Sequence, residues 1–440
     1  MKAPSPRVGI EAVAGRLGAG RALSSVTHKV FPTHRSFLWG ELALYSFVVL
    51  LVTGVYLTFF FEASQEVTTY TGSYEPLNGR EVSLAYDSVM RTQFDTRAGA
   101  LIRQTHHWAA ITFVAAIVLH LARIYFTGAF RKPREINWLV GSGLLVLALG
   151  AGFTGYSLPD DLLSGTGLRI ANGIILSIPV IGEWLADMIF GGEWPGAGII
   201  GRLYPVHIML IPALIIGLLS VHLAIVWRQK HTQFPGEGRT EHNVVGQRVW
   251  PGFAMKSIGL LFLTAAVITA MGAVFTVNAV WLYGPYEPAA ATSFAQPDWY
   301  IGFLEGTVRL FPNWEPHIGG HMLPNPFYAA VLLPGIIFTT LFMVPFIERR
   351  VTGDRAEHHL LDRPRDAPVR TSLGVAALSL MALLFVGGAQ DIVAETSGIP
   401  VGRVTTILQI SLLVVPAISG WTTWRICKAL TGVPESSPQR

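Results

Sequence analysis

The sequence predicts an all-α integral membrane protein with eight transmembrane helices. Of its 440 residues, 51% are hydrophobic and only 14% are charged, whereas about a quarter of the residues in a soluble domain are charged. A hydrocarbon core of about 30 Å is crossed by about 20 apolar residues in a helix. Eight apolar runs are long enough, and they start near Phe37, His106, Trp138, Leu203, Ser257, Phe327, Thr371 and Val404.

The loops between these runs differ in charge in a regular alternation. Lys and Arg are concentrated in the N-terminal segment and in the loops after the second, fourth and sixth runs, whereas the intervening loops carry more Asp and Glu. Loops rich in Lys and Arg remain on the cytoplasmic side of a membrane. We therefore expect a multi-pass protein of the bacterial cell membrane with both termini in the cytoplasm.

Composition excludes several kinds of site. The net charge of +4 gives no indication of nucleic-acid binding, and the basic residues are explained as topology signals. The single cysteine, Cys427, excludes a disulfide within the chain and a haem attached through two cysteines. It also excludes an iron–sulfur cluster or a zinc ion held by several cysteines of this chain, so such a centre would belong to a partner.

Four histidines lie within two of the apolar runs at similar spacing. His106 and His120 are 14 residues apart, and His207 and His222 are 15 residues apart. In a helix these spacings are about 40° and 60° from whole turns and correspond to rises of about 21 and 22 Å. Both runs cross from outside to inside, so His106 lies level with His207 near the outer surface, and His120 with His222 near the inner surface.

These levels predict two metal ions, each held between two imidazoles. Haem iron suits an apolar slot with two protein ligands, whereas zinc requires about four. We therefore expect two non-covalent b-type haems within a bundle of the first four helices. The alternative is a set of hydrogen-bonded core histidines. His107 is about 140° from His120 around the helix, so we assign it a structural or neighbouring role.

Arginines and glycines occur at the levels of the histidines. Arg103 and Arg202 at the outer level and Arg123 at the inner level are candidates to bind the haem propionates, although arginines at helix ends also extend to the membrane surface without a ligand. Four glycines with spacing 14 would let a porphyrin edge approach the backbone, although small residues also serve ordinary helix packing. They are Gly40 and Gly141 at the inner level and Gly54 and Gly155 at the outer level.

Together these residues resemble cytochrome b of the cytochrome bc complexes. Two further motifs support the resemblance, Gly155-Tyr156-Ser157-Leu158-Pro159 and Pro297-Asp298-Trp299-Tyr300, the latter in place of a Pro-Glu-Trp-Tyr type motif. The resemblance covers the chain from about Val30 to the eighth span. The segment 229–236 resembles the actinobacterial menaquinol–cytochrome c reductase branch.

The resemblance implies the activity, cofactors and partners. A quinol–cytochrome c reductase oxidises quinol, here by expectation menaquinol, at the outer face. One electron goes to a Rieske iron–sulfur protein and a di-haem cytochrome c subunit, and the other crosses through the two haems to quinone at the inner face (the Q cycle). It also implies a homodimer of complexes and a supercomplex with cytochrome c oxidase.

The resemblance also assigns the quinone sites. We expect Asp298 to accept a quinol proton, with a pKa raised by its apolar surroundings; the alternative is an N-cap of a helix within 297–311. Tyr156 is a second catalytic candidate, or else an interfacial tyrosine. Pro297, Trp299 and Tyr300 complete the outer quinone site.

The inner quinone site is less well defined by the resemblance. Lys230 and His231 are its candidate residues, and Lys230 is equally explained as a topology signal. Ser257 stands where the mitochondrial type has Asp, Trp227 where it has His, and Leu38 where the photosynthetic type has the cysteine of a third haem. His317 and His321 are left unassigned.

The resulting domain organisation has five parts. They are a cytoplasmic segment (1–36), the haem-binding four-helix bundle (37–230), a cytoplasmic connection (231–256), C-terminal helices with the quinol-site loop (257–428) and a cytoplasmic tail (429–440).

Two other functions stay open, a di-haem anchor of another oxidoreductase and a proton-coupled transporter. A transporter predicts charged midplane residues and broken helices, and an anchor would lack the Pro-Asp-Trp-Tyr loop.

Overall fold

The computed structural model describes residues 27–192, 196, 198–290 and 296–431. Most of the expected cytoplasmic N-terminal segment (1–26) and of the expected tail (432–440) lies outside the described residues. Within the described part, eight helical segments are long and apolar enough to cross a membrane, which confirms the predicted fold class. They are Arg35–Thr58, Gly99–Phe126, Glu135–Tyr156, Ile199–Gln229, Val249–Val274, Phe327–Thr352, Pro368–Gly388 and Val401–Leu430.

The first four segments form the part of the fold that carries the four histidines. They comprise α3 (Leu38–Thr58), α5 (Gly99–Phe126), α6 (Glu135–Tyr156), and a fourth segment made of α9 (Ile199–Pro205), η3 (Val206–Leu210) and α10 (Ile211–Gln229). α3 packs against α5, and α10 against α6. The core between them is apolar, with the rings of Phe47 and Phe113 stacked at a centroid distance of 5.4 Å.

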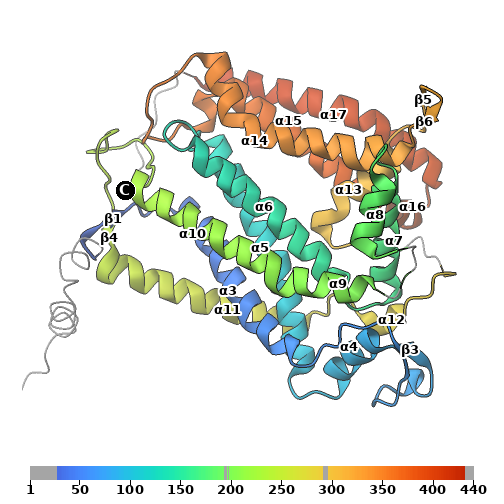
Figure 1. Cartoon of the computed structure of the whole chain (residues 1–440). Coiled ribbons are helices and arrows are strands. Elements are labelled where there is room, and N and C mark those ends of the chain that lie inside the picture. Colours follow the sequence, from blue (N-terminus) through green and yellow to red (C-terminus); the bar gives the residue numbers. More distant parts are fainter. Residues whose placement is uncertain (1–26, 193–195, 197, 291–295, 432–440) are drawn as a thin grey trace, which may run out of the picture.

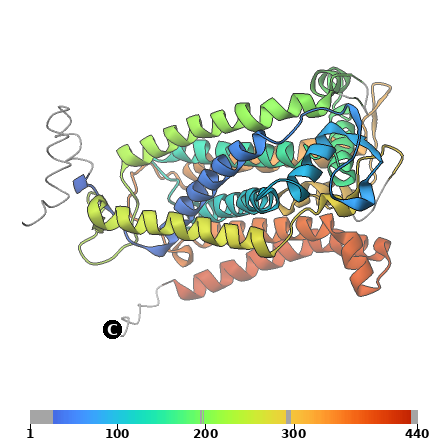
Figure 2. The same cartoon turned by 90° about the horizontal axis from the view of Figure 1, so that it is seen from below.

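The last four segments lie beside this group. They comprise η4 (Val249–Phe253) with α11 (Ala254–Val274), η5 (Phe327–Leu332) with α14 (Leu333–Thr352), α15 (Pro368–Gly388) and α17 (Val401–Leu430). α11 packs against α5 and α3, whereas α15 packs against α17. Figures 1 and 2 show α15 and α17, in orange and red, as a layer on one side of the molecule.

Most of the short elements gather at one end of the bundle, on the right in Figure 1. They are β2 (Val67–Thr69) and β3 (Glu81–Ser83), which pair antiparallel, η2 (Glu75–Leu77), α4 (Leu84–Phe94), α7 (Leu162–Leu176), α8 (Gly182–Phe190), α12 (Val280–Tyr283), α13 (Trp299–Leu310), the β5–β6 hairpin (His317–Ile318 and His321–Met322) and α16 (Gln390–Ser397). The helix expected within 297–311 is therefore present as α13. His317 and His321 are exposed on the hairpin.

The basic loops meet at the opposite end. There β1 (Val30–Phe31) pairs antiparallel with β4 (Gln247–Arg248), and two short turns, η1 (Arg35–Phe37) and η6 (Pro364–Asp366), lie in the same loops. The guanidinium of Arg134 donates to the backbone oxygens of His358 (2.7 Å) and Lys230 (3.1 Å). One side chain thus ties three loops together, and the basic loops that the charge pattern assigns to one side of the membrane do share one end of the fold.

The fourth segment contains a π-helical turn at the level of its first histidine. η3 spans Val206–Leu210 and includes His207, between Pro205 and Pro212. A proline has no N–H to donate and disturbs the regular helical ladder. A π turn contains more residues than an α turn, so 15 residues on this helix cover nearly the same rotation as 14 residues on α5. The unequal histidine spacings are thereby reconciled.

Candidate functional site

The four histidines form two pairs across the space between α5 and the fourth segment. The ring centroids of His106 and His207 are 6.3 Å apart. Those of His120 and His222 are 6.4 Å apart. The structure therefore brings together the two pairs that the spacing predicts, one nearer each end of the bundle.

The separation of the rings fits a metal ion held between them. A metal–imidazole bond is about 2.0 Å long, so two imidazoles on opposite sides of one ion have ring centroids about 6 Å apart. Both pairs have this separation, although their sequence spacings differ. In the described part of the chain, no group of three or more His, Cys, Asp or Glu side chains could hold a metal. A two-ligand haem iron therefore fits the donor set better than zinc does.

Threonines fix the imidazoles of the outer pair. Nδ1 of His106 lies 2.9 Å from the Thr53 hydroxyl. Nδ1 of His207 lies 3.2 Å from the Thr154 hydroxyl and 3.1 Å from the carbonyl oxygen of Ala151. A hydrogen bond at Nδ1 holds the ring in one orientation and leaves Nε2 free to bind a metal. In the inner pair, Nδ1 of His120 is buried without a partner among the described residues.

Each of the four predicted glycines lies beside one of these imidazoles. A Cβ at Gly40 would be 3.0 Å from Cε1 of His120, and one at Gly54 would be 3.3 Å from Cε1 of His106. A Cβ at Gly155 would collide with the His207 ring, whereas one at Gly141 would be 3.8 Å from His222. The glycines thus occupy the predicted levels. In this structure Gly40, Gly54 and Gly155 make room for the histidine rings, whereas a Cβ at Gly141 would make only an ordinary van der Waals contact.

The three candidate arginines have different surroundings. Arg123 is buried and lines the cavity around the inner pair, and its Nε and Nη2 have no partner in the described part of the chain. Arg103 is held by the side chain of Gln93 (2.9 Å) and the carbonyl oxygen of Asn278. Arg202 is exposed and donates to the carbonyl oxygen of Met188 (2.6 Å). Arg123 therefore has free donors for an anionic group, whereas Arg202 is engaged at the end of α8.

Asp298 lies at the start of α13 and contacts α5. Its Oδ1 is 2.7 Å from Nε2 of His107, and its Oδ2 accepts from the Tyr300 hydroxyl at 2.6 Å. It occupies the N-cap position of α13, but its side chain makes no capping hydrogen bond. The carboxylate is therefore used in a contact between two parts of the fold that are distant in sequence.

The expectation of a raised pKa for Asp298 is wrong. Burial raises the pKa of this carboxyl, but the hydrogen bond and charge of His107 and the hydrogen bond from Tyr300 more than offset burial. The net result is a pKa below the ordinary value, because two donors stabilise the ionised form. Asp298 is thus ionised at neutral pH and able to accept a proton. Sequence reasoning missed the contact with His107, for which the available signal was a second histidine at the outer end of the helix.

The two sequence motifs of the outer end meet through Tyr300. Its ring is 2% exposed and lies against Gly152 of α6, where a Cβ would be 2.6 Å from the hydroxyl. Tyr156 is one turn further along α6, at its C-terminal residue. Trp299 is more exposed than Tyr300, and its ring is 5.9 Å from that of Phe385. Asp298, Tyr300 and Tyr156 therefore belong to one cluster, next to His107.

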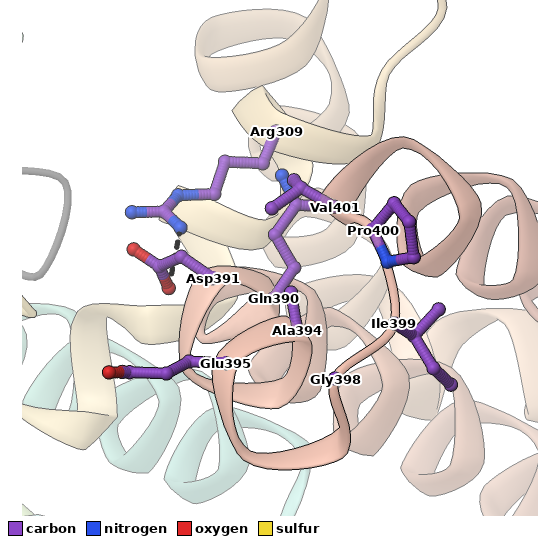
Figure 3. A pocket seen from close by; sticks show the side chains of 9 residues that line it. All are labelled: Arg309, Gln390, Asp391, Ala394, Glu395, Gly398, Ile399, Pro400 and Val401. Atoms are coloured by element: carbon purple, nitrogen blue, oxygen red, sulfur yellow. Dashed lines mark ion pairs between the residues drawn. The ribbon is translucent and has the colours of Figure 1, made fainter.

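A second acidic group lies on the same helix. Glu305 forms an ion pair with Arg309, which also pairs with Asp391 of α16 at 3.0 Å (Figure 3). Arg309 and Asp391 line a surface cavity together with Gln390 and Glu395. Burial raises the pKa of Glu305 to about 7, although Arg309 acts in the opposite direction. This group was not singled out from the sequence.

The raised pKa of Glu305 makes stability depend on pH. A carboxyl whose pKa rises from 4.5 to about 7 on folding stabilises the fold fully below the lower value, and this contribution is lost as pH rises through the higher value. We expect Glu305→Gln to remove a pH-dependent difference of at most about 3 kcal/mol. Thermal unfolding of both proteins from pH 4.5 to 8 measures it. If the unfolding temperatures of wild type and variant changed with pH in parallel, the raised pKa of Glu305 would be contradicted.

The inner histidine pair opens into a cavity of about 470 Å³. Its wall includes His120 and Arg123 from α5, His222 from α10, and Lys230 and His231 from the loop that follows α10. Burial lowers the pKa of His231 to about 4, with Lys29, Arg134 and Arg123 adding to the effect. The imidazole is therefore neutral at pH 7. The structure thus brings both inner-site candidates to the cavity that contains the inner histidine pair.

Comparison with known proteins places this arrangement in a family. Residues 111–285 match the family model of cytochrome b (N-terminal)/b6/petB. The cytochrome bc1 complex cytochrome b subunit of Mycobacterium tuberculosis is 51% identical over 410 residues, which are 93% of this chain and 74% of that protein. This chain belongs to the cytochrome b subunits of cytochrome bc1 complexes.

Further relatives agree with this assignment. The corresponding subunits of Corynebacterium efficiens (49% identity; 92% of this chain and 74% of that protein) and Streptomyces coelicolor (46%; 98% and 79%) are similar. A solved hyperthermophilic respiratory complex III has the same fold, with a TM-score of 0.67 at 18% identity over 94% of this chain and 99% of that one. This cytochrome b is therefore an integral membrane subunit of a quinol–cytochrome c reductase, and neither a transporter nor an anchor of another oxidoreductase is supported.

Proposed function

We propose that this cytochrome b oxidises menaquinol at the outer face and passes one electron across the membrane, through two b haems, to quinone at the inner face. The observation that carries the proposal is the pair of imidazole–imidazole gaps, 6.3 and 6.4 Å between ring centroids. Their equal separation at two depths is unexplained by core packing and suits two equivalent cofactors.

The residues assigned to the haems follow from these gaps. His106 and His207 would hold the outer, low-potential haem, and His120 and His222 the inner, high-potential one. Bound haems supply one-electron transfer between the two faces. Arg123 would bind a propionate of the inner haem through its unpartnered nitrogens, and Arg103 one of the outer haem. Arg202 is the weakest of these assignments, because its guanidinium already donates a hydrogen bond to the carbonyl oxygen of Met188.

The levels of the histidines determine how far charge moves. The rise along α5 between His106 and His120 is about 21 Å of a hydrocarbon core of about 30 Å. Moving one charge across 100 mV changes its energy by about 2.3 kcal/mol. Electron transfer toward the inner face therefore contributes to the membrane potential, provided that the two haems differ in potential.

Proton transfer at the outer site is assigned to Asp298. Its ionised carboxylate accepts a proton from a quinol hydroxyl, as a positioned general base does. Tyr156 and Tyr300 offer hydroxyl groups beside it, while Pro297 and Trp299 form the apolar wall of the site. The contact with His107 holds the Asp298 carboxylate against α5.

The remaining assignments concern the assembly. We propose a Rieske iron–sulfur protein and a di-haem cytochrome c subunit as partners, a homodimer of complexes, and a supercomplex with cytochrome c oxidase. The five-part division of the chain and a plasma-membrane orientation with the basic loops in the cytoplasm complete the proposal. The meeting of the basic loops at one end of the fold supports that orientation.

Quinol-driven haem reduction tests the proposed function. In the purified complex, a short-chain naphthoquinol should reduce the b-type absorption bands, and cytochrome c should be reduced at the same time. Removing the Rieske partner should stop cytochrome c reduction but leave reduction of the haems through the inner site. Haem bands that do not respond to quinol would contradict the proposal.

A further inference from the structure

A carboxylate lies in the wall of the inner cavity, within the membrane-spanning part of the fold. Glu41 is on the first turn of α3, next to Gly40, and lines the cavity that His120, His222 and His231 also line. Ionisable side chains in membrane-spanning helices usually face the protein interior or a water-filled cavity and mark a substrate or proton path.

Two hydroxyl groups hold the carboxylate of Glu41. Its Oε2 accepts from the Ser257 hydroxyl of α11 at 2.6 Å and from the Tyr45 hydroxyl at 3.1 Å. The two hydroxyls also contact each other, so three side chains from two helices form a closed triangle. Both bonds converge on Oε2, and Oε1 accepts none from the described residues. One carboxyl oxygen is therefore available to a ligand.

Ser257 is the member of this triangle that lies on α11. Ser257 cannot supply a proton at neutral pH. Its hydroxyl donates to the carboxylate of Glu41, so the acid at this contact between α3 and α11 is Glu41.

Basic side chains also line the cavity. Arg123, Arg134, Lys230 and His231 line it together with the aromatic rings of Phe31 and Trp227. Nδ1 of His231 is buried without a partner among the described residues, while its ring packs on Phe31 at 4.2 Å between centroids. A flat ligand with polar oxygens therefore has a carboxyl group and a hydrogen-bonding imidazole available in the same cavity.

We propose that Glu41 donates a proton to quinone at the inner site, positioned by Ser257 and Tyr45; this rests on the function proposed above. The quinone gains two electrons, delivered singly from quinol oxidised at the outer site, and two protons. One O–H bond forms at a carbonyl oxygen as the carboxyl O–H of Glu41 breaks, and its electron pair stays on the carboxylate. The neutral imidazole of His231 binds the other carbonyl by a hydrogen bond, and that carbonyl takes its proton from water at the basic end. Glu41 regains its proton from the same water.

Inner-site kinetics test this role in the intact complex. An Asp298→Asn background blocks the outer site, so that a short-chain naphthoquinol reduces the inner haem only from the inner site, which is the same proton transfer in reverse. Stopped-flow absorbance follows the haem. We expect Glu41→Gln to slow this reduction at least about tenfold, because positioned acid–base groups contribute about 10²–10⁴-fold, and to leave the haem spectrum unchanged.

Three further variants make the result specific. Adding Ser257→Asp to Glu41→Gln should restore most of the rate, because it returns an acid to the same place. Ser257→Ala should slow the reaction by a few fold, since Glu41 then loses one of its two donors. Glu237→Gln, an exposed acid of the loop at the same end, should leave the rate unchanged. If Glu41→Gln does not assemble, Glu41→Asp should assemble and keep most of the rate.

The outcomes separate this inference from the proposed function. A rate in Glu41→Gln equal to that of the background protein would overturn the role of Glu41 and leave the proposed function intact. A failure of Ser257→Asp to rescue a slow Glu41→Gln would assign Glu41 to structure and overturn the proton-donor role. The absence of any quinol-driven haem reduction in wild type would contradict the proposed function itself.

Discussion

Replacing His106 by leucine should remove the outer haem and leave the inner one in place. The variant loses one of two axial ligands and leaves His207 without a partner at 6.3 Å, whereas the inner pair is about 21 Å away along the helix. The reduced-minus-oxidised spectrum should keep about half of the b-type absorbance. Quinol-driven cytochrome c reduction should be abolished.

His107→Leu is the matched control for this experiment. Its imidazole contacts Asp298 rather than His207, so both haems should remain while quinol oxidation slows. The opposite pattern, in which His107→Leu loses a haem and His106→Leu keeps both, would overturn the ligand assignment on α5. The two residues are adjacent in sequence but serve different sites, which makes the comparison sharp.

Asp298→Asn should reduce quinol oxidation at the outer site by about 10²–10⁴-fold, the usual contribution of a positioned proton acceptor. The amide retains the size of the carboxylate and its hydrogen bond with Tyr300, but it cannot take up a proton. Haem content should therefore be unchanged. Steady-state cytochrome c reduction, with the haem spectrum recorded on the same sample, measures both quantities.

Two controls distinguish a catalytic role of Asp298 from a structural one. Asp298→Glu preserves the proton acceptor and should keep most of the rate. Asp187→Asn removes an exposed acid from α8 at the same end of the molecule and should have no effect. Full activity of Asp298→Asn would mean that another group, such as Glu305, accepts the proton.

The sequence predicts the membrane-spanning architecture well, because apolar length is a strong local signal. Six spans begin within four residues of the expected position, within the usual error for element boundaries, and the fifth begins at Val249, eight residues before Ser257, because η4 precedes α11. The second span begins at Gly99, seven residues before His106, since Arg103 and Gln104 interrupt the apolar run but not the helix. The helix α13 also follows from its amphipathic pattern.

Other features depend on tertiary contacts and could not be read from spacing alone. An ideal α-helix places His207 and His222 about 60° apart, and the π turn at Val206–Leu210 reduces that angle. Pro212 was the available signal for it. The partnership of His107 with Asp298 joins residues 191 positions apart. The contact of Glu41 with Ser257 likewise joins two helices that are distant in sequence.

The haem content of the purified chain tests the central claim most directly. Haem b extracted from a known amount of protein, combined with a redox titration of its absorbance, should give two haems per chain that titrate at two different potentials. One haem per chain, or none, would contradict the assignment of the two histidine pairs as axial ligands.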